Sequence, residues 1–121
     1  MSSSVQGIIL FGHGSRDPLW RKPMEAVAQR LRERAPVQVR CAFLELEQPD
    51  LLTVGAELAS LGLAQVRIVP MFLGTGRHAR EDLPLLVSQL RQTHPHTHFH
   101  LQVAVGEDSR VLELLATIAL E

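Results

Sequence analysis

The sequence predicts a three-layer α/β fold in which a mainly parallel sheet is covered by helices on both faces. Short apolar runs alternate along the chain with segments whose apolar residues recur every three or four positions, which is the spacing of one helix face. Four runs alternate with four such segments. Alternation of this kind implies right-handed crossovers between parallel strands.

The composition fits one domain of this type. The chain has 121 residues, of which 45% are hydrophobic and 21% charged, so we expect a single α/β domain over residues 1–121. A formal net charge of −1 gives no electrostatic reason to expect nucleic-acid binding. The basic residues are all arginines except Lys22. Arginine holds carboxylates with a planar fork, so this bias fits an anionic small ligand, although lineage bias explains it equally well.

The sequence also predicts the compartment. Met1 to Gln6 contain no basic segment leading into an apolar one, and no later run approaches the length of a membrane span. Cys41 is the only cysteine, and it lies in an apolar strand-like run. We expect it to be a buried small residue rather than a disulfide or a nucleophile. Together these features predict a protein of the reducing cytoplasm, with no membrane partner.

The helical segments have recognisable ends. Helix starts are predicted at Asp17-Pro18, at Pro49-Asp50, and at Asp82 ahead of Pro84, because an acidic residue in the first turn meets the positive end of the helix dipole. Gly62 after Leu61 predicts a helix end. The four apolar stripes are Trp20-Met24-Val27-Leu31, Leu51-Val54-Leu58-Leu61, Leu83-Leu86-Val87-Leu90 and Val111-Leu114-Leu115-Ile118.

Strand character predicts the strand order. Residues 8–11 and 68–73 are almost continuously apolar, as expected for central strands buried on both faces. Residues 37–40 and 99–103 alternate apolar with polar, which suits edge strands. The simplest order is 2-1-3-4, a flavodoxin-like arrangement. The chain then leaves strands 1 and 3 in opposite directions, so the crevice between their carboxyl ends is the switch point where ligands bind.

Two histidines flank that crevice in glycine-containing turns. His13 lies in the run Gly12-His13-Gly14-Ser15-Arg16, and His78 ends the run Gly74-Thr75-Gly76-Arg77-His78. Imidazole is both a ligand of transition metals and a base near neutral pH. The glycines permit tight turns and also close approach of a ligand to the backbone. A single histidine here would be read as structural, whereas a pair at one switch point predicts a ligand site.

Three motifs are spaced along the chain. They are Gly12-His13-Gly14-Ser15-Arg16-Asp17, Phe43-Leu44-Glu45 with Pro49, and Val69-Pro70-Met71-Phe72-Leu73-Gly74 with His78 and Asp82-Leu83-Pro84. These motifs resemble those of the short-form class II tetrapyrrole chelatases, and among these the CbiX-type sirohydrochlorin cobaltochelatases are the nearest. The resemblance covers essentially the whole chain and implies half of a class II chelatase fold. It implies an ATP-independent, lyase-type enzyme that inserts a divalent metal into sirohydrochlorin, towards cobalamin or sirohaem. Cobalt is expected, with nickel or iron as alternatives, and no nucleotide cofactor.

The resemblance also implies roles for individual residues. His13, His78 and Glu45 are expected to bind the metal or accept the pyrrole protons, with Glu47 as a rival to Glu45. The polycarboxylate substrate is expected to meet cations and backbone donors beside the histidines. The alternative is that the arginines only pair with carboxylates such as Asp17 and Asp82. The expected substrate contacts are Ser15, Arg16, Thr75, Gly76 and Arg77, with Arg80 nearby.

Larger relatives in this class look like two such units in one chain with a cleft between them. A single unit of 121 residues is therefore expected to pair as a homodimer, with its cleft across a two-fold axis.

A second group of histidines follows, at His94, His96, His98 and His100. On a strand the last three would share one face, opposite Phe99. They form either a metal-loading patch or simply the exposed face of an edge strand.

Two other functions compete with the chelatase. A histidine phosphatase needs an arginine immediately before its catalytic histidine, where this chain has Gly12. A non-enzymatic metal-delivery protein would bind metal stoichiometrically and release no metallated product.

Overall fold

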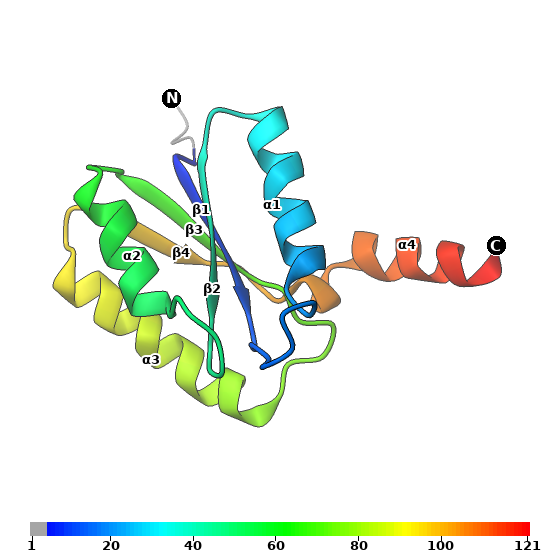
Figure 1. Cartoon of the computed structure of the whole chain (residues 1–121). Coiled ribbons are helices and arrows are strands. Elements are labelled where there is room, and N and C mark those ends of the chain that lie inside the picture. The colour runs from blue at the N-terminus through cyan, green and yellow to red at the C-terminus, as the bar shows by residue number, and fades with distance from the viewer. Residues whose placement is uncertain (1–4) are drawn as a thin grey trace.

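Strands and helices alternate along the chain in the computed structural model, which describes residues 5–121 (Figure 1). The strands are β1 (Gly7–Gly12), β2 (Gln38–Phe43), β3 (Gln65–Pro70) and β4 (His98–Leu101). The helices are α1 (Lys22–Arg34), α2 (Leu51–Ser60), α3 (Arg77–Thr93) and α4 (Ser109–Leu120), with a 3-10 turn, η1 (Val105–Glu107). All strand pairs are parallel and the order is β2-β1-β3-β4, which confirms the predicted fold class and strand order.

The sheet separates two apolar cores. Neighbouring residues of β1 point to opposite faces, so Ile9 and Phe11 pack with α2 and α3, whereas Leu10 packs with Met24 of α1. Helices α2 and α3 cover one face, and α1 covers the β1–β2 half of the other (Figure 1). Helices therefore lie on both faces of the sheet, as predicted.

Strand β3 ends earlier than the apolar run predicts. It stops at Pro70, and residues 71–73 form the following loop, in which Leu73 is 67% exposed. Phe72 stays buried because its ring meets the Phe11 ring edge-on, with 6.0 Å between the centroids. The apolar residues of segment 68–73 therefore contribute both to the strand and to the packing of the loop that follows it.

Two predicted helix starts are wrong. Helix α1 begins at Lys22 rather than at Asp17-Pro18, because the Asp17 carboxylate accepts the Leu19 N–H at 2.9 Å and closes a turn ahead of the helix. Helix α3 begins at Arg77, with Gly76 as its N-cap residue, so Asp82 lies beyond the first turn. Pro84 lies inside α3 with its ring exposed, and the helix continues past it to Thr93.

The predicted ends of α2 are confirmed. The Asp50 carboxylate accepts the Thr53 N–H at 2.8 Å and caps the helix. At the other end, Gly62 adopts a φ of 79°, the left-handed conformation that terminates helices.

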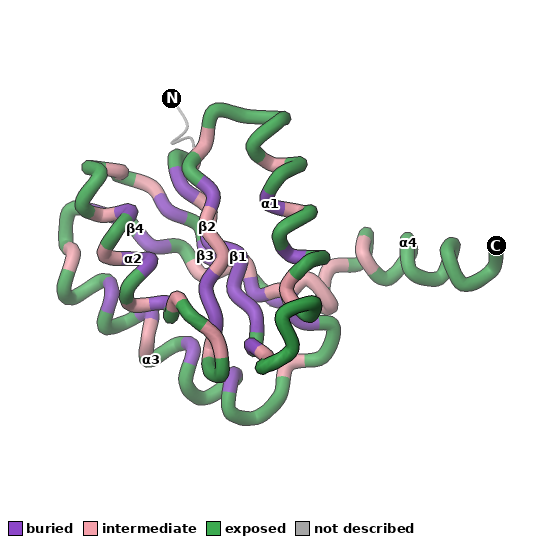
Figure 2. The backbone as a smooth tube through the Cα atoms, in the orientation of Figure 1, coloured by how far each residue is buried: buried purple, intermediate pink, exposed green. Residues whose placement is uncertain are grey.

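Helix α4 is formed as predicted, but its apolar stripe is not buried within the chain. No residue of α4 is buried, and Figure 2 shows the helix as mostly exposed, away from the sheet. Leu114 is 60% and Ile118 57% exposed. The periodicity predicted the helix correctly, whereas its packing against this sheet is not observed.

The remaining sequence expectations concern Cys41 and the membrane. Cys41 is a free, half-buried thiol on β2, and burial raises its pKa. Within residues 5–121, no helix combines the length and apolarity needed to cross a bilayer.

Candidate functional site

Backbone pairing beyond the strand ends brings His13 and Glu45 together. The Leu44 N–H donates to the Gly12 carbonyl at 2.9 Å, and the Glu45 N–H donates to the His13 carbonyl at 3.0 Å. The ladder between β1 and β2 thus continues into the two following loops. His13 Nε2 lies 3.7 Å from Glu45 Oε1, and each side chain is 48% exposed. An imidazole and a carboxylate therefore face each other at the carboxyl edge of the sheet, open to solvent.

Gly14 allows these two loops to touch. Its φ is 102°, and a Cβ at this position would overlap the Glu45 carbonyl. In the facing loop, Leu46 is held at a φ of 68°, a left-handed conformation that is unusual for leucine. Close contact between the loops is thus achieved with one glycine and one strained residue.

Glu47 stabilises the loop that carries His13 and does not face the open His13–Glu45 pair. Its side chain is 11% exposed and accepts the Ser15 N–H at 2.9 Å. Its other oxygen lies 3.4 Å from Arg21 Nη1, and the Arg21 guanidinium lies 4.6 Å above the Phe43 ring. Between the two candidate acids, Glu45 is the one beside His13. The Glu47–Arg21 anchor was not predicted from the sequence, because its partners are 26 residues apart.

His78 lies in the first turn of α3, at the carboxyl side of β3, and its side chain is exposed. The sequence placed it at the end of a turn, whereas the structure places it inside the helix. Across residues 5–121, no group of three or more His, Cys, Asp or Glu side chains is arranged to hold a metal. The structure thus pairs His13 with Glu45 and leaves His78 outside that pair.

The predicted substrate contacts lie in the loop after β1 and in the loop and first helical turn after β3. Ser15 is already engaged, since its hydroxyl accepts the Asp17 N–H at 3.0 Å, and Arg16 is exposed beside it. Arg77 pairs with Glu81 at 2.9 Å across an exposed helix turn, and so not with Asp82.

Close to Arg77, the chain enters α3 through Thr75 and Gly76. Arg80 donates to the Thr75 carbonyl at 2.8 Å, and Gly76 is the N-cap residue. The N-terminus of α3, with its unpaired N–H groups, is therefore next to His78.

An apolar rim at the carboxyl edge was not predicted. Each of the loops that follow the four strands exposes a large apolar side chain, and these side chains are between 51% and 67% exposed. Water-exposed apolar residues gathered around polar groups are typical of ligand or partner surfaces. In the sequence, the feature that could have predicted this rim is the presence of apolar residues within segments that read as turns. The rim residues are Leu19, Leu46, Leu73 and Val103.

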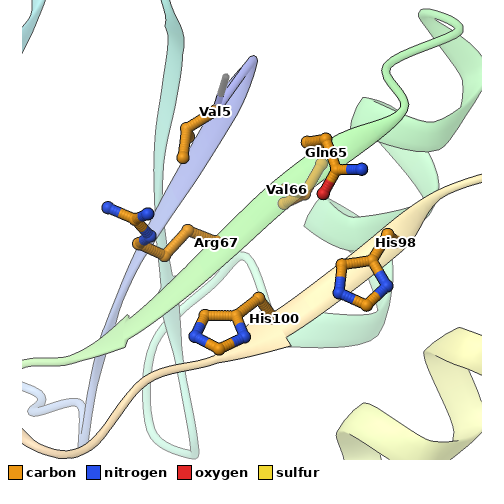
Figure 3. A pocket seen from close by; sticks show the side chains of 6 residues that line it. All are labelled: Val5, Gln65, Val66, Arg67, His98 and His100. Carbon is orange, nitrogen blue, oxygen red and sulfur yellow. The ribbon is translucent and has the colours of Figure 1, made fainter. Parts of the chain in front are cut away.

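The second histidine group is divided between three elements. His98 and His100 are exposed on β4 and Phe99 between them is buried, which confirms the predicted alternation (Figure 3). His96 precedes the strand, so the predicted three-histidine face is wrong. The chain turns here because the Thr97 N–H donates to the His94 carbonyl at 3.1 Å. His94 ends α3, and its ring lies 6.2 Å from the Phe99 ring.

The fold and this edge define a doubly wound α/β protein with an open histidine–carboxylate pair at the ends of its central strands. The family model described as CbiX matches residues 7–120, and the chain belongs to the CbiX family. The family resemblance drawn from the three motifs is thereby confirmed.

Known relatives agree with this assignment. The sirohydrochlorin cobaltochelatase of Sulfolobus acidocaldarius is 26% identical over 109 residues, which cover 90% of this chain and 85% of the relative. That of Methanothermobacter thermautotrophicus is 32% identical over 78 residues, 64% of this chain, and the match spans about half of the relative (54%). A crystal structure of a putative cobalamin biosynthesis CbiX protein from Marinobacter aquaeolei VT8 superposes with a TM-score of 0.81 at 31% identity, covering 94% of this chain and 93% of that one.

Proposed function

We propose that this protein is a sirohydrochlorin metal chelatase, which inserts a divalent metal into the macrocycle without a nucleotide cofactor. The observation that carries the proposal is the His13–Glu45 pair, half-exposed at the carboxyl edge of a CbiX-family fold. Relatives that cover most of this chain bear the name of the cobalt enzyme. Cobalt is therefore the proposed metal, and nickel and iron are the alternatives that imidazole and carboxylate ligands also accept.

Metal insertion removes two pyrrole N–H protons and exchanges the ligands of the metal for ring nitrogens. In the proposed mechanism, the His13 imidazole and the Glu45 carboxylate, 3.7 Å apart, hold the incoming metal or accept the two pyrrole protons, which then pass to solvent. His78 completes the set from α3 when substrate is bound. The pair is open to solvent, which suits delivery, because a closed cage of four ligands would retain the metal.

The substrate carries carboxylates around a flat macrocycle. Arg16, Arg77 and the N-terminus of α3 at Thr75 and Gly76 are the proposed contacts for the carboxylates. Ser15 holds its loop in place through bonds to Asp17 and Glu47. The apolar rim defined above, from Leu19 to Val103, supplies surface for the macrocycle itself.

The working unit is proposed to be the single domain 1–121 paired with a second copy, in the cytoplasm. A reducing compartment fits the free thiol of Cys41. Pairing would build a cleft between two open edges, each of which is exposed in the single chain.

The experiment is an anaerobic absorbance assay. Purified protein is mixed with sirohydrochlorin and cobalt(II), nickel(II) or iron(II), and the macrocycle spectrum is followed over time. We expect insertion well above the protein-free rate, and large losses in His13→Ala and His78→Ala. His96→Ala, an exposed histidine outside the edge, is the matched control.

Two outcomes would overturn the proposal. One is insertion no faster than in buffer; the other is a rate that both substitutions leave unchanged. Stoichiometric metal binding without metallated product would identify a metal-delivery protein instead.

A further inference from the structure

One half of a sheet face has no helix over it and contains a cluster of basic and polar side chains. Helix α1 covers β1 and β2 on this face, whereas the β3–β4 half is open (Figure 1). A hollow of about 220 Å³ lies there, and none of the six residues around it is acidic. It is lined by Val5, Gln65, Val66, Arg67, His98 and His100 (Figure 3). The lining therefore supplies a guanidinium and several hydrogen-bond donors without a counter-charge of its own.

The strand register places four of these side chains at the corners of one small rectangle. Gln65 is paired with His98, and Arg67 with His100, along the neighbouring parallel strands β3 and β4. Residues two apart on a strand point to the same face, and Phe99 between the two imidazoles is buried on the other. The corners are therefore about 5 Å apart between the strands and about 7 Å apart along them. A ligand of a few atoms at the centre lies within reach of all four side chains.

Arg67 is the only strand arginine whose guanidinium has no partner among residues 5–121. The other, Arg40 on β2, pairs with Glu57 at 3.2 Å. Arg91 of α3, close to β4, donates to the Phe99 carbonyl at 2.8 and 3.0 Å. Figure 3 shows the Arg67 guanidinium on the β1 side of the hollow and the two imidazoles along β4. An unpaired guanidinium that faces two imidazoles lacks a counter-charge, and an anion would supply it.

The same lining disfavours a metal cation. Two imidazoles on one strand face are potential ligands of a divalent metal. However, Arg67 places a permanent positive charge beside His100, and no carboxylate of the lining offsets it. Within residues 5–121, no further His, Cys, Asp or Glu completes a metal-binding group of three with them. Imidazole donates hydrogen bonds to an anion in both its neutral and its protonated form, so the chemistry of the hollow matches an anion.

We propose that the hollow binds a small tetrahedral oxyanion, namely phosphate or the phosphate group of a monoester. A carboxylate has two oxygens in one plane, and the planar fork of Arg67 alone satisfies them. A phosphate directs its oxygens to several sides, so it also accepts hydrogen bonds from His98, His100 and the Gln65 amide. Donors on two strands, arranged around one centre, therefore favour the tetrahedral anion.

The proposed anion site is separate from the His13–Glu45 pair. Arg67 is paired with Ile8, near the start of β1. His13 follows the other end of that strand, which lies about 13 Å further along it. An anion in the hollow is thus out of contact with the pair proposed for metal insertion, and the inference does not depend on the chelatase activity.

The test is a titration of the full, metal-free chain in chloride at constant ionic strength. Proton–carbon NMR follows the histidine ring signals, which single His→Gln variants assign. Inorganic phosphate and methyl phosphate are the two probes, and acetate is the carboxylate comparison. We expect saturable shifts of the His98 and His100 signals with phosphate, about 10-fold weaker binding of acetate, and no saturable shift of His96. If methyl phosphate binds as well, the ligand is a monoester; if only inorganic phosphate binds, it is the free ion.

Substitution of Arg67 tests whether the guanidinium holds the anion. Arg67→Gln is expected to weaken phosphate binding by about 10-fold, and Arg67→Lys, which retains the charge and loses the fork, by less. Because the side chain is exposed, both variants should show the parent circular dichroism spectrum. Arg34→Gln removes an equally exposed arginine at the end of α1 and is the matched control. It should leave the phosphate affinity unchanged.

Three results would contradict the proposed site. Shifts that fail to saturate, or an equal loss in Arg67→Gln and Arg34→Gln, would show general screening of charge. Acetate binding as tight as that of phosphate would refute the tetrahedral preference. A zinc(II) titration that moves the His98 and His100 signals, where phosphate does not, would identify a metal site instead. No step measures metal insertion, so failure here is distinct from failure of the chelatase assay.

Discussion

At the residue scale, Glu45 and Glu47 have opposite surroundings, since the first is open to solvent and the second is almost buried. Glu45 and His13 are each half-exposed, and an exposed contact of this kind contributes at most about 1 kcal/mol to folding. Glu47 is almost buried and holds Ser15 and Arg21 in place. Chemistry and stability are therefore separable in this loop by single substitutions.

His13→Ala and Glu45→Gln are expected to reduce metal insertion by about 100-fold or more, since each removes a proton-accepting or ligating group. Both should change the free energy of unfolding by less than about 0.5 kcal/mol, because the side chains are exposed. Urea unfolding and the absorbance assay measure the two effects. Glu57→Gln, which removes an exposed acid paired with Arg40 at 3.2 Å, is the control and should retain full activity.

Glu47→Ala is expected to lower the free energy of unfolding by about 1–3 kcal/mol, because the Ser15 N–H and Arg21 both lose a buried acceptor. Glu47→Gln retains an oxygen for Ser15 and should lose less. Urea unfolding compares these variants with Glu45→Ala. An equal loss in Glu45→Ala would contradict the division of tasks between the two glutamates.

At the element scale, the ends of α2 are determined locally and those of α1 and α3 are not. Asp50 and Gly62 satisfy the backbone groups at the two ends of α2 directly. Asp17 forms a turn with its own neighbours instead of capping α1. At α3 the glycine-rich loop sets the start, so that His78 falls in the first helical turn.

The cap of α2 makes part of the stability depend on pH. Hydrogen bonds from the side chain and backbone of Thr53 lower the pKa of Asp50 below its usual 3.8. The folded state therefore binds this proton less readily than the unfolded state. The contribution of the carboxylate is complete above 3.8 and is lost as the pH falls through the lower folded pKa.

Asp50→Ala is accordingly expected to cost about 1 kcal/mol at neutral pH. The difference from the parent protein should shrink in strong acid, and urea unfolding at both pH values would measure it. Asp82→Ala, at the position wrongly predicted to start a helix, should cost less than about 0.5 kcal/mol. A difference for Asp50→Ala that stays constant with pH would refute the capping role of the ionised carboxylate.

At the scale of the whole molecule, one face of the sheet is complete and the other is not. Helices α2 and α3 bury one side, while α1 leaves β3 and β4 open and α4 stands apart. The same chain therefore exposes the apolar rim at its carboxyl edge and the apolar stripe of α4.

If the apolar stripe of α4 contributes to the proposed pairing of two copies, Leu115→Lys is expected to give a monomer, because it places a charge in that stripe. Light scattering after gel filtration should show a mass of 13.4 kDa instead of twice that value. Circular dichroism should show an otherwise folded protein. Thr117→Lys, two residues away on the polar side, should remain dimeric; dissociation of both variants, or of neither, would contradict the role of this stripe.

The sequence by itself determined the alternation of elements, the strand order, the turn that carries His13 and the caps of α2. These follow from local spacing and from burial, which a single chain displays directly. Only the tertiary structure decided that Glu45 meets His13 while Glu47 turns inward, because backbone pairing between distant segments sets these directions. It also decided that α4 leaves the sheet. The spacing of apolar residues predicts which side of a helix is apolar. It does not predict which surface covers that side.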